Sequence, residues 1–253
     1  MKILITITAL VLFAPTLDVF GQRRRPRAQL KQRPAVEQKS KEIGATAIVM
    51  DETLSVLRMR PSLFSDSVQR MRRGRAVRVI GVAEADGVKF YRVTALPAGS
   101  GWVQPDALFG RFRVGDAERL ARLIQASSGF DQIELGSKFF EMFPDSPLRP
   151  SIWLLYGDLL EEAAAKLSKD AAGRLDRREM AATGAPMHSY YLNFVMLDRY
   201  RKLGVLFVFD PATRAFHYDG ACWRQIVTKF PASAEFAEAE KRLDSLKSKM
   251  EKK

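Results

Sequence analysis

The chain has 253 residues, of which 47% are hydrophobic, which is enough for two modest domains with a core each. Its formal net charge is +12, but half of that excess lies in residues 22–42, which hold eight Lys or Arg and two Glu. A nucleic-acid-binding domain gathers its basic residues on a folded face, so this distribution argues against a specific nucleic-acid partner.

Residues 1–21 are typical of a secretory signal peptide. Lys2 precedes a short apolar run, and Val19-Phe20-Gly21 offers a small residue at the cleavage position. We therefore expect an exported protein, either periplasmic or secreted. An inner-membrane protein anchored by the uncleaved segment is the alternative, because the arginines after Gly21 resist translocation. A cytosolic protein is a third interpretation.

Residues 22–43 predict a basic, disordered linker. Arg, Lys, Gln, Pro and Ala dominate this segment, and it has hardly any apolar side chain to bury. We interpret it as a solvated spacer. As an alternative, its cations contact anionic polymers of the cell envelope.

Residues 44–110 alternate apolar and polar side chains, a pattern that predicts several short strands closing into a small β-barrel. Asp86-Gly87 and Gly99-Ser100-Gly101 are turn signals between strands. The expected strands cover residues 46–50, 54–58, 75–80, 88–93 and 102–103.

Four pieces of this segment, taken in order, resemble the bacterial SH3-like domain. They are Leu54-x-Val56-Leu57-Arg58-x-Arg60-Pro61-Ser62, Gly74-Arg75-x-Val77-x-Val79, Phe90-Tyr91-Arg92-Val93 and Gly101-Trp102-Val103. The resemblance implies a small barrel that is used for binding, in some members to a cell-wall peptide or glycan, and it does not imply catalysis.

Tyr91 and Trp102 are the candidate ligand-binding residues of this segment. We expect Trp102 to fill the core of so small a barrel, and the alternative is an aromatic platform for a ligand. For Tyr91 the two interpretations stay open, because its neighbour Phe90 should face the opposite side of the strand.

From Asp116 onward, apolar residues recur with the period of a helix, and Asp116 is expected to cap the first one. The run Val205-Leu206-Phe207-Val208-Phe209 is interpreted as a buried connection between helices; the alternative is the lining of a concave groove. The expected helices cover residues 117–126, 131–143, 148–167, 170–182, 187–203, 218–230 and 232–249.

Two motifs divide these helices in the same way. Phe143-Pro144-Asp145-Ser146 and Phe230-Pro231-Ala232-Ser233 each end one helix and start another. Together with Trp153-x-x-Tyr156-Gly157-x-x-Leu160, they resemble divergent tetratricopeptide repeats of periplasmic and outer-membrane-assembly proteins. The resemblance implies an all-α helical array over residues 111–250.

The chain offers little that a catalytic or metal site needs. With one Cys and two His, we expect no metal, no cofactor and no catalytic residue. His217 and Cys222 suggest a thiol hydrolase, but their spacing on a helix would direct them to different faces.

We therefore expect a non-enzymatic interaction or scaffold protein of the cell envelope, with a protein or cell-wall (peptidoglycan) partner. One alternative is a peptidoglycan-targeting accessory subunit of a cell-wall enzyme. The other is an unrecognised hydrolase centred near His217.

Overall fold

The computed structural model describes residues 40–95, 99–175 and 177–251. The expected signal peptide (residues 1–21) and most of the expected linker (residues 22–43) lie outside these ranges, so both stay predictions. Among the described residues, every helix is too short or too polar to cross a membrane.

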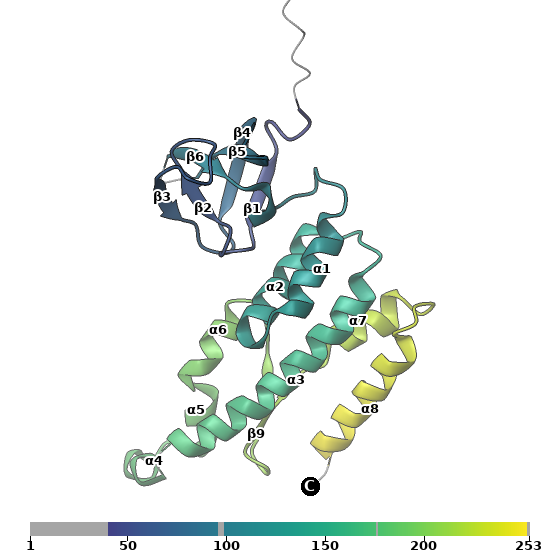
Figure 1. Ribbon diagram of the computed structural model, residues 1–253. Helices are drawn as coiled ribbons and strands as arrows, with labels where there is room; N and C mark the ends of the chain where they lie inside the picture. The colour runs from purple at the N-terminus through teal and green to yellow at the C-terminus, as the bar shows by residue number, and fades with distance from the viewer. Residues whose placement is uncertain (1–39, 96–98, 176, 252–253) are drawn as a thin grey trace, which may run out of the picture. The chain divides into compact units, whose positions relative to one another are not determined.

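The first part of the described chain folds into a seven-stranded antiparallel sheet (Figure 1). Its strands lie in the order β3-β2-β6-β5-β4-β1-β7. They are β1 (Thr46–Val49), β2 (Val56–Arg58), β3 (Ser67–Arg70), β4 (Ala76–Ala85), β5 (Val88–Thr94), β6 (Ser100–Val103) and β7 (Leu108–Phe109), with a short 3₁₀ helix, η1 (Pro105–Ala107), before β7.

The prediction of a closed barrel is wrong, because β3 and β7 are the two ends of the sheet and do not pair with each other. β7 has only two residues, and its Phe109 packs against helices. β3 carries a bulge: Leu57 pairs with Gln69 and Arg58 with Ser67, which leaves Val68 unpaired and 47% exposed. Neither end therefore offers a strand that could close the sheet.

One face of the sheet is apolar and forms a core of its own. Along β5, Tyr91 and Val93 belong to this core, and Arg92 between them points to the opposite face, on which the period of a strand also places the buried Phe90. The same core includes Ala47, Val49, Leu57, Met71, Val77, Val79, Ala95, Val103, Ala107 and Leu108.

The second part of the chain is mainly helical (Figure 1). Its helices are α1 (Asp116–Ala126), α2 (Gly129–Met142), α3 (Arg149–Arg174), α4 (Arg177–Thr183), α5 (Met187–Leu192), α6 (Asp198–Arg201), α7 (Ala221–Lys229) and α8 (Phe236–Glu251), with a 3₁₀ turn, η2 (Val195–Leu197), before α6.

The prediction of an all-α array is also wrong, because β8 (Phe207–Asp210) and β9 (Ala215–Tyr218) form an antiparallel hairpin. The Asp210 carboxylate shapes the turn by accepting hydrogen bonds from the Ala212 N–H and the Thr213 hydroxyl. The apolar run expected to be a buried connection thus supplies β8. Its partner β9 lies on α3, where the Phe216 N–H donates to Ser168 Oγ at 2.7 Å.

Both Phe-Pro-x-Ser boundaries are confirmed. α2 ends at Met142, just before Pro144, and α7 ends at Lys229, just before Pro231. After the first boundary, Ser146 Oγ accepts a hydrogen bond from the Leu148 N–H at 3.2 Å, close to the start of α3.

α3 and α7 come very close together at Gly157. A Cβ atom at this position would lie 2.7 Å from Cε2 of Trp223, well inside the normal separation of two carbon atoms. Trp223 is buried, and its ring meets that of Tyr218 edge to face, with centroids 5.5 Å apart. The missing side chain at Gly157 is what lets the indole ring lie against α3.

Sheet and helices share a further hydrophobic cluster. Met50, which follows β1, and Phe109 of β7 pack with Leu120 and Ile124 of α1 and with Phe139 of α2. The described residues accordingly belong to one compact unit. That the ranges 44–110 and 111–250 are separate domains stays a prediction.

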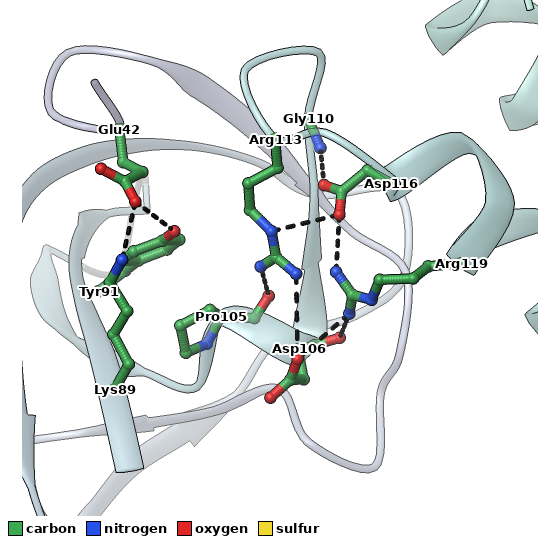
Figure 2. Close-up of polar contacts among 9 residues, drawn as sticks. All are labelled: Glu42, Lys89, Tyr91, Pro105, Asp106, Gly110, Arg113, Asp116 and Arg119. Atoms are coloured by element: carbon green, nitrogen blue, oxygen red, sulfur yellow. Dashed lines mark hydrogen bonds and ion pairs between the residues drawn. The ribbon is translucent and has the colours of Figure 1, made fainter. Parts of the chain in front are cut away.

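A buried carboxylate reinforces this junction (Figure 2). The prediction that Asp116 caps α1 is wrong: Gly115 holds the capping position, with φ 84°, and Asp116 is the first residue of the helix. The Asp116 side chain is fully buried and accepts a hydrogen bond from the Gly110 N–H at 2.9 Å. Its other oxygen lies 2.7 Å from Arg119 Nη1 and 3.2 Å from Arg113 Nε.

The same two arginines reach back to the segment between β6 and β7 (Figure 2). Arg113 Nη1 donates to the Pro105 carbonyl at 2.8 Å, and Arg119 Nη2 donates to the Asp106 carbonyl at 3.0 Å. The Arg119 guanidinium also lies 4.6 Å from the ring centroid of Phe109. Asp116 is therefore the central charge of a network that joins α1 to the end of the sheet.

Candidate functional site

The face of the sheet opposite the apolar core carries an aromatic residue between two cations. Trp102 of β6 pairs with Arg58 of β2 on one side and with Arg92 of β5 on the other. Paired residues on neighbouring strands point to the same face, so the three side chains form one cross-strand row. Gly81 of β4 continues the row opposite Arg92 and adds no side chain to it.

Trp102 does not fill the core, so the expectation that it would is wrong. Its neighbours Gly101 and Val103 are buried, whereas Trp102 is only partly buried and belongs to none of the hydrophobic clusters. Alternation along the strand turns it to the outer face. That Trp102 is an aromatic platform for a ligand, the alternative interpretation, stays a prediction.

The cations of this face are largely free to meet a ligand. Arg92 is exposed and so is Arg78, which lies in the adjacent row opposite Thr46 and Thr94. Within the described residues neither of these two arginines has a hydrogen bond or an ion pair. Arg58 is partly buried, and its Nη1 donates to the Ser65 carbonyl at 2.8 Å, which holds the guanidinium in place.

Tyr91 lies on the other face and has a different environment (Figure 2). It is buried in the sheet core, with its ring 6.4 Å from that of Phe112. Its hydroxyl donates to the Glu42 carboxylate at 3.4 Å, and Lys89 Nζ lies 2.8 Å from the same carboxylate. Trp102 and Tyr91, both singled out from the sequence, therefore do not share a site.

The pKa values of Glu42 and Tyr91 reflect this contact. The hydrogen bond from Lys89 lowers the pKa of the Glu42 carboxyl, and burial raises the pKa of the Tyr91 phenol. The phenol thus stays protonated and donates to an ionised carboxylate. This contact fastens residue 42 to β5, and it leaves the Tyr91 hydroxyl occupied.

The side chains around Trp102 offer two kinds of contact that a ligand could use. An indole face stacks on flat apolar surfaces, including the faces of sugar rings, while guanidinium groups bind carboxylates or phosphates with two parallel hydrogen bonds. No residue of the two cross-strand rows on this face is acidic. The first row is Arg58, Trp102, Arg92 and Gly81, and the second is Ser100, Thr94, Arg78 and Thr46. We call the residues Arg58, Arg78, Arg92 and Trp102 the outer-face patch.

Among the described residues, no hydrogen bond or ion pair joins His217 to Cys222, the two residues on which the thiol-hydrolase hypothesis depends. His217 Nδ1 lies 3.5 Å from Glu161 Oε1. The Cys222 N–H, at the start of α7, donates a hydrogen bond to the Tyr218 hydroxyl oxygen at 2.7 Å. Burial raises the pKa of the Cys222 thiol to about 11, so the thiolate that a nucleophile needs is disfavoured at neutral pH. In the described part of the chain, no group of three His, Cys, Asp or Glu side chains could hold a metal ion.

Glu161 has a structural role that predicts a specific pH dependence. Its carboxylate accepts hydrogen bonds from Lys249 Nζ of α8 at 2.8 Å and from the Tyr218 N–H of β9 at 3.0 Å. Burial pushes its pKa up, but these two hydrogen bonds together with the nearby charges outweigh burial, so the pKa of Glu161 is lowered.

A lowered pKa in the folded state means that Glu161 stabilises the fold at neutral pH and loses this effect as the pH falls through its folded value. We expect Glu161→Gln to remove about 1 kcal/mol of stability at pH 7 and much less at pH 3. Urea midpoints measured from pH 7 to pH 3 check this. Glu162→Gln, on the exposed side of the same helix, is the matched control and should follow the wild-type curve; a Glu161→Gln curve parallel to the wild type would contradict the assignment.

Comparison of the chain with protein-family models, with curated proteins and with solved structures found no match, so the fold and the outer-face patch are interpreted from the chain's own residues.

Proposed function

We propose that the protein is a non-enzymatic binding protein of the bacterial cell envelope, and that its outer-face patch holds an anionic cell-wall polymer such as peptidoglycan. The observation that carries the proposal is the cross-strand row in which Trp102 lies between Arg58 and Arg92. A glycan strand offers sugar faces to the indole, and its peptide stems offer carboxylates to the guanidinium groups.

Two further features support a ligand of this kind. An open strand face accommodates a polymer that is too large for a closed pocket, and the two cross-strand rows on this face include cations and no carboxylate. The signal-peptide-like residues 1–21 would deliver the chain to the compartment that contains the polymer. Export of the protein across the inner membrane is therefore part of the proposal. A targeting subunit of a cell-wall enzyme would use the same patch and is a narrower form of the same proposal.

The test is a pull-down of the purified protein with isolated sacculi. We expect the wild type to sediment with the sacculi, and we expect Trp102→Ala to weaken binding by about 10- to 100-fold, as for a residue at the centre of an interface. Arg92→Ala should weaken it several-fold, and the effect should shrink as salt is raised. Arg122→Ala, an exposed arginine of α1, is the matched control and should bind like the wild type.

A truncated protein without residues 1–39 separates the patch from the basic segment. If the patch carries binding, the truncated protein still sediments, and Trp102→Ala weakens it as in the full chain. The proposal fails if the wild type stays in the supernatant, if truncation alone abolishes binding, or if Trp102→Ala and Arg92→Ala bind like Arg122→Ala. Circular dichroism melts of each variant establish that the protein remains folded.

A further inference from the structure

A separate cavity of about 530 Å³ lies in the helical part of the chain, between the end of α3, α4, α5 and the β8–β9 turn. Small-molecule sites usually have volumes of about 300–1,000 Å³ and mainly apolar walls with a few polar groups. The apolar lining of this cavity consists of Leu175, Met180, Met187, Tyr191 and four alanines, Ala172, Ala181, Ala185 and Ala215.

The floor of the cavity is fixed, while part of its wall can adapt. The Tyr191 ring is buried and stacks on Phe209, with ring centroids 4.6 Å apart. The Ser168 hydroxyl is already engaged, because it donates to the Ala164 carbonyl and accepts from the Phe216 N–H. α4 contributes Arg177, Met180 and Ala181 to the lining, and none of its residues is fully buried. The thioethers of the two methionines can adjust to an irregular apolar group.

Two arginines stand at this cavity, one on each of two different elements. Arg177 begins α4, and Arg214 lies in the β8–β9 turn. Among the described residues, neither has a hydrogen bond or an ion pair, and none of the lining residues is acidic. The carboxylate nearest in sequence to Arg214 is that of Asp210, which is occupied by the turn itself. As far as the described residues go, the cavity therefore combines a mainly apolar wall with two arginines that have no acidic partner.

The backbone of Arg214 gives a second, independent indication. Its φ is 54°, in the left-handed region that favours glycine, and every other described residue with positive φ except Asp86 is a glycine. A turn alone would be more stable with glycine at this position. An arginine kept in an unfavourable backbone conformation beside a cavity points to a use for its side chain.

We propose that this cavity binds a single-chain carboxylate amphiphile of the fatty-acid type. Its alkyl chain lies against Tyr191 and the methionines, and its carboxylate is bound by Arg177 and Arg214. Two guanidinium groups suit this head group, since each can donate two parallel hydrogen bonds to a carboxylate. This site is independent of the outer-face patch, because the two share no residue, so either can fail without the other.

The test is a calorimetric titration of the full chain with decanoate, at concentrations below those at which decanoate forms micelles. We expect saturable binding with one site per chain. Decanol has the same chain without the charge and should bind at least tenfold more weakly. Arg214→Gln and Arg177→Gln should each weaken decanoate binding by about tenfold, and Ala172→Trp, which fills the cavity, should abolish it.

Two variants separate a binding role from a structural one. Arg174→Gln removes an exposed arginine from the last turn of α3, outside the cavity lining, and should leave binding unchanged. Arg214→Gly should raise the melting temperature, because glycine relieves the backbone, and yet weaken decanoate as Arg214→Gln does.

The proposal is overturned if decanoate does not bind, if decanol binds equally well, or if Arg214→Gln and Arg177→Gln bind decanoate like Arg174→Gln. A lower melting temperature for Arg214→Gly would mean that the turn itself requires arginine, which removes the argument from its backbone.

Discussion

Replacement of Asp116 by alanine is expected to lower the free energy of unfolding by about 3 kcal/mol or more. Among the described residues of this ionic network, Asp116 is the one whose charged side chain is fully buried, and its loss leaves the two arginines without that partner. Arg113 and Arg119 would then face each other across the vacated position, and the Gly110 N–H would lose its acceptor. Both arginine side chains are less than one quarter exposed, so water would compensate them only in part.

The matched control is Asp106→Ala. Asp106 contacts the same two arginines, but its side chain is 59% exposed and its nearest ion-pair distance is 3.4 Å. A pair of that kind contributes between zero and about 1 kcal/mol. Urea unfolding followed by circular dichroism compares the two variants. Equal losses for Asp116→Ala and Asp106→Ala would contradict the view that the buried carboxylate joins α1 to the sheet.

The second large effect is expected at Gly157. A methyl group there would overlap the indole of Trp223, and neither α3 nor the buried ring can move away without disturbing the core. We expect Gly157→Ala to cost about 2–3 kcal/mol of stability. The same substitution at Gly173, also in α3, meets no atom within 4 Å and should raise stability by up to about 1 kcal/mol through helix propensity.

Because the two substitutions are chemically identical and lie in one helix, their difference isolates the contact between α3 and α7. Thermal and urea unfolding of both variants measure it. The assignment is wrong if Gly157→Ala stabilises the protein as Gly173→Ala does. A double variant, Gly157→Ala with Trp223→Phe, should recover part of the loss, since the smaller ring leaves room for the methyl group.

The local elements could be predicted where the side-chain period was clear. The alternation around Val77 and Val79 and around Tyr91 and Val93 gave β4 and β5, and the Phe-Pro-x-Ser motifs placed the ends of α2 and α7. β3 was missed because Ser67–Arg70 is an edge strand with little to bury, so it carries no apolar alternation.

The arrangement of the helices and strands depends on contacts between distant residues, which the spacing of apolar side chains along the chain does not reveal. Nothing in the run around Phe207 distinguishes a buried connection from a strand until its partner at Ala215–Tyr218 is placed beside it. The closed barrel failed for a similar reason, because the pairing of the two end strands depends on the bulge at Val68 and on the helices that take up Phe109.

One residue of the candidate site, Trp102, could be predicted from the sequence. Trp102 was singled out, but its orientation was misjudged, because a large aromatic in a short strand is more often part of the core. Arg92 and Arg58 were not named as site residues, since only the register of β2, β5 and β6 brings them beside Trp102. The alternation of Gly101, Trp102 and Val103 along the strand is the signal in the sequence that indicates an outward Trp102.

The bulge at Val68 has a consequence for the behaviour of the protein in concentrated solution. β3 is the end strand opposite β7, and an end strand of regular geometry invites stacking of chains into fibrils. The bulge at Val68, together with the charged Arg70 on the same strand, interrupts the regular row of backbone groups with which another chain could pair. The bulge at Val68 therefore works against edge-to-edge pairing of two chains through β3.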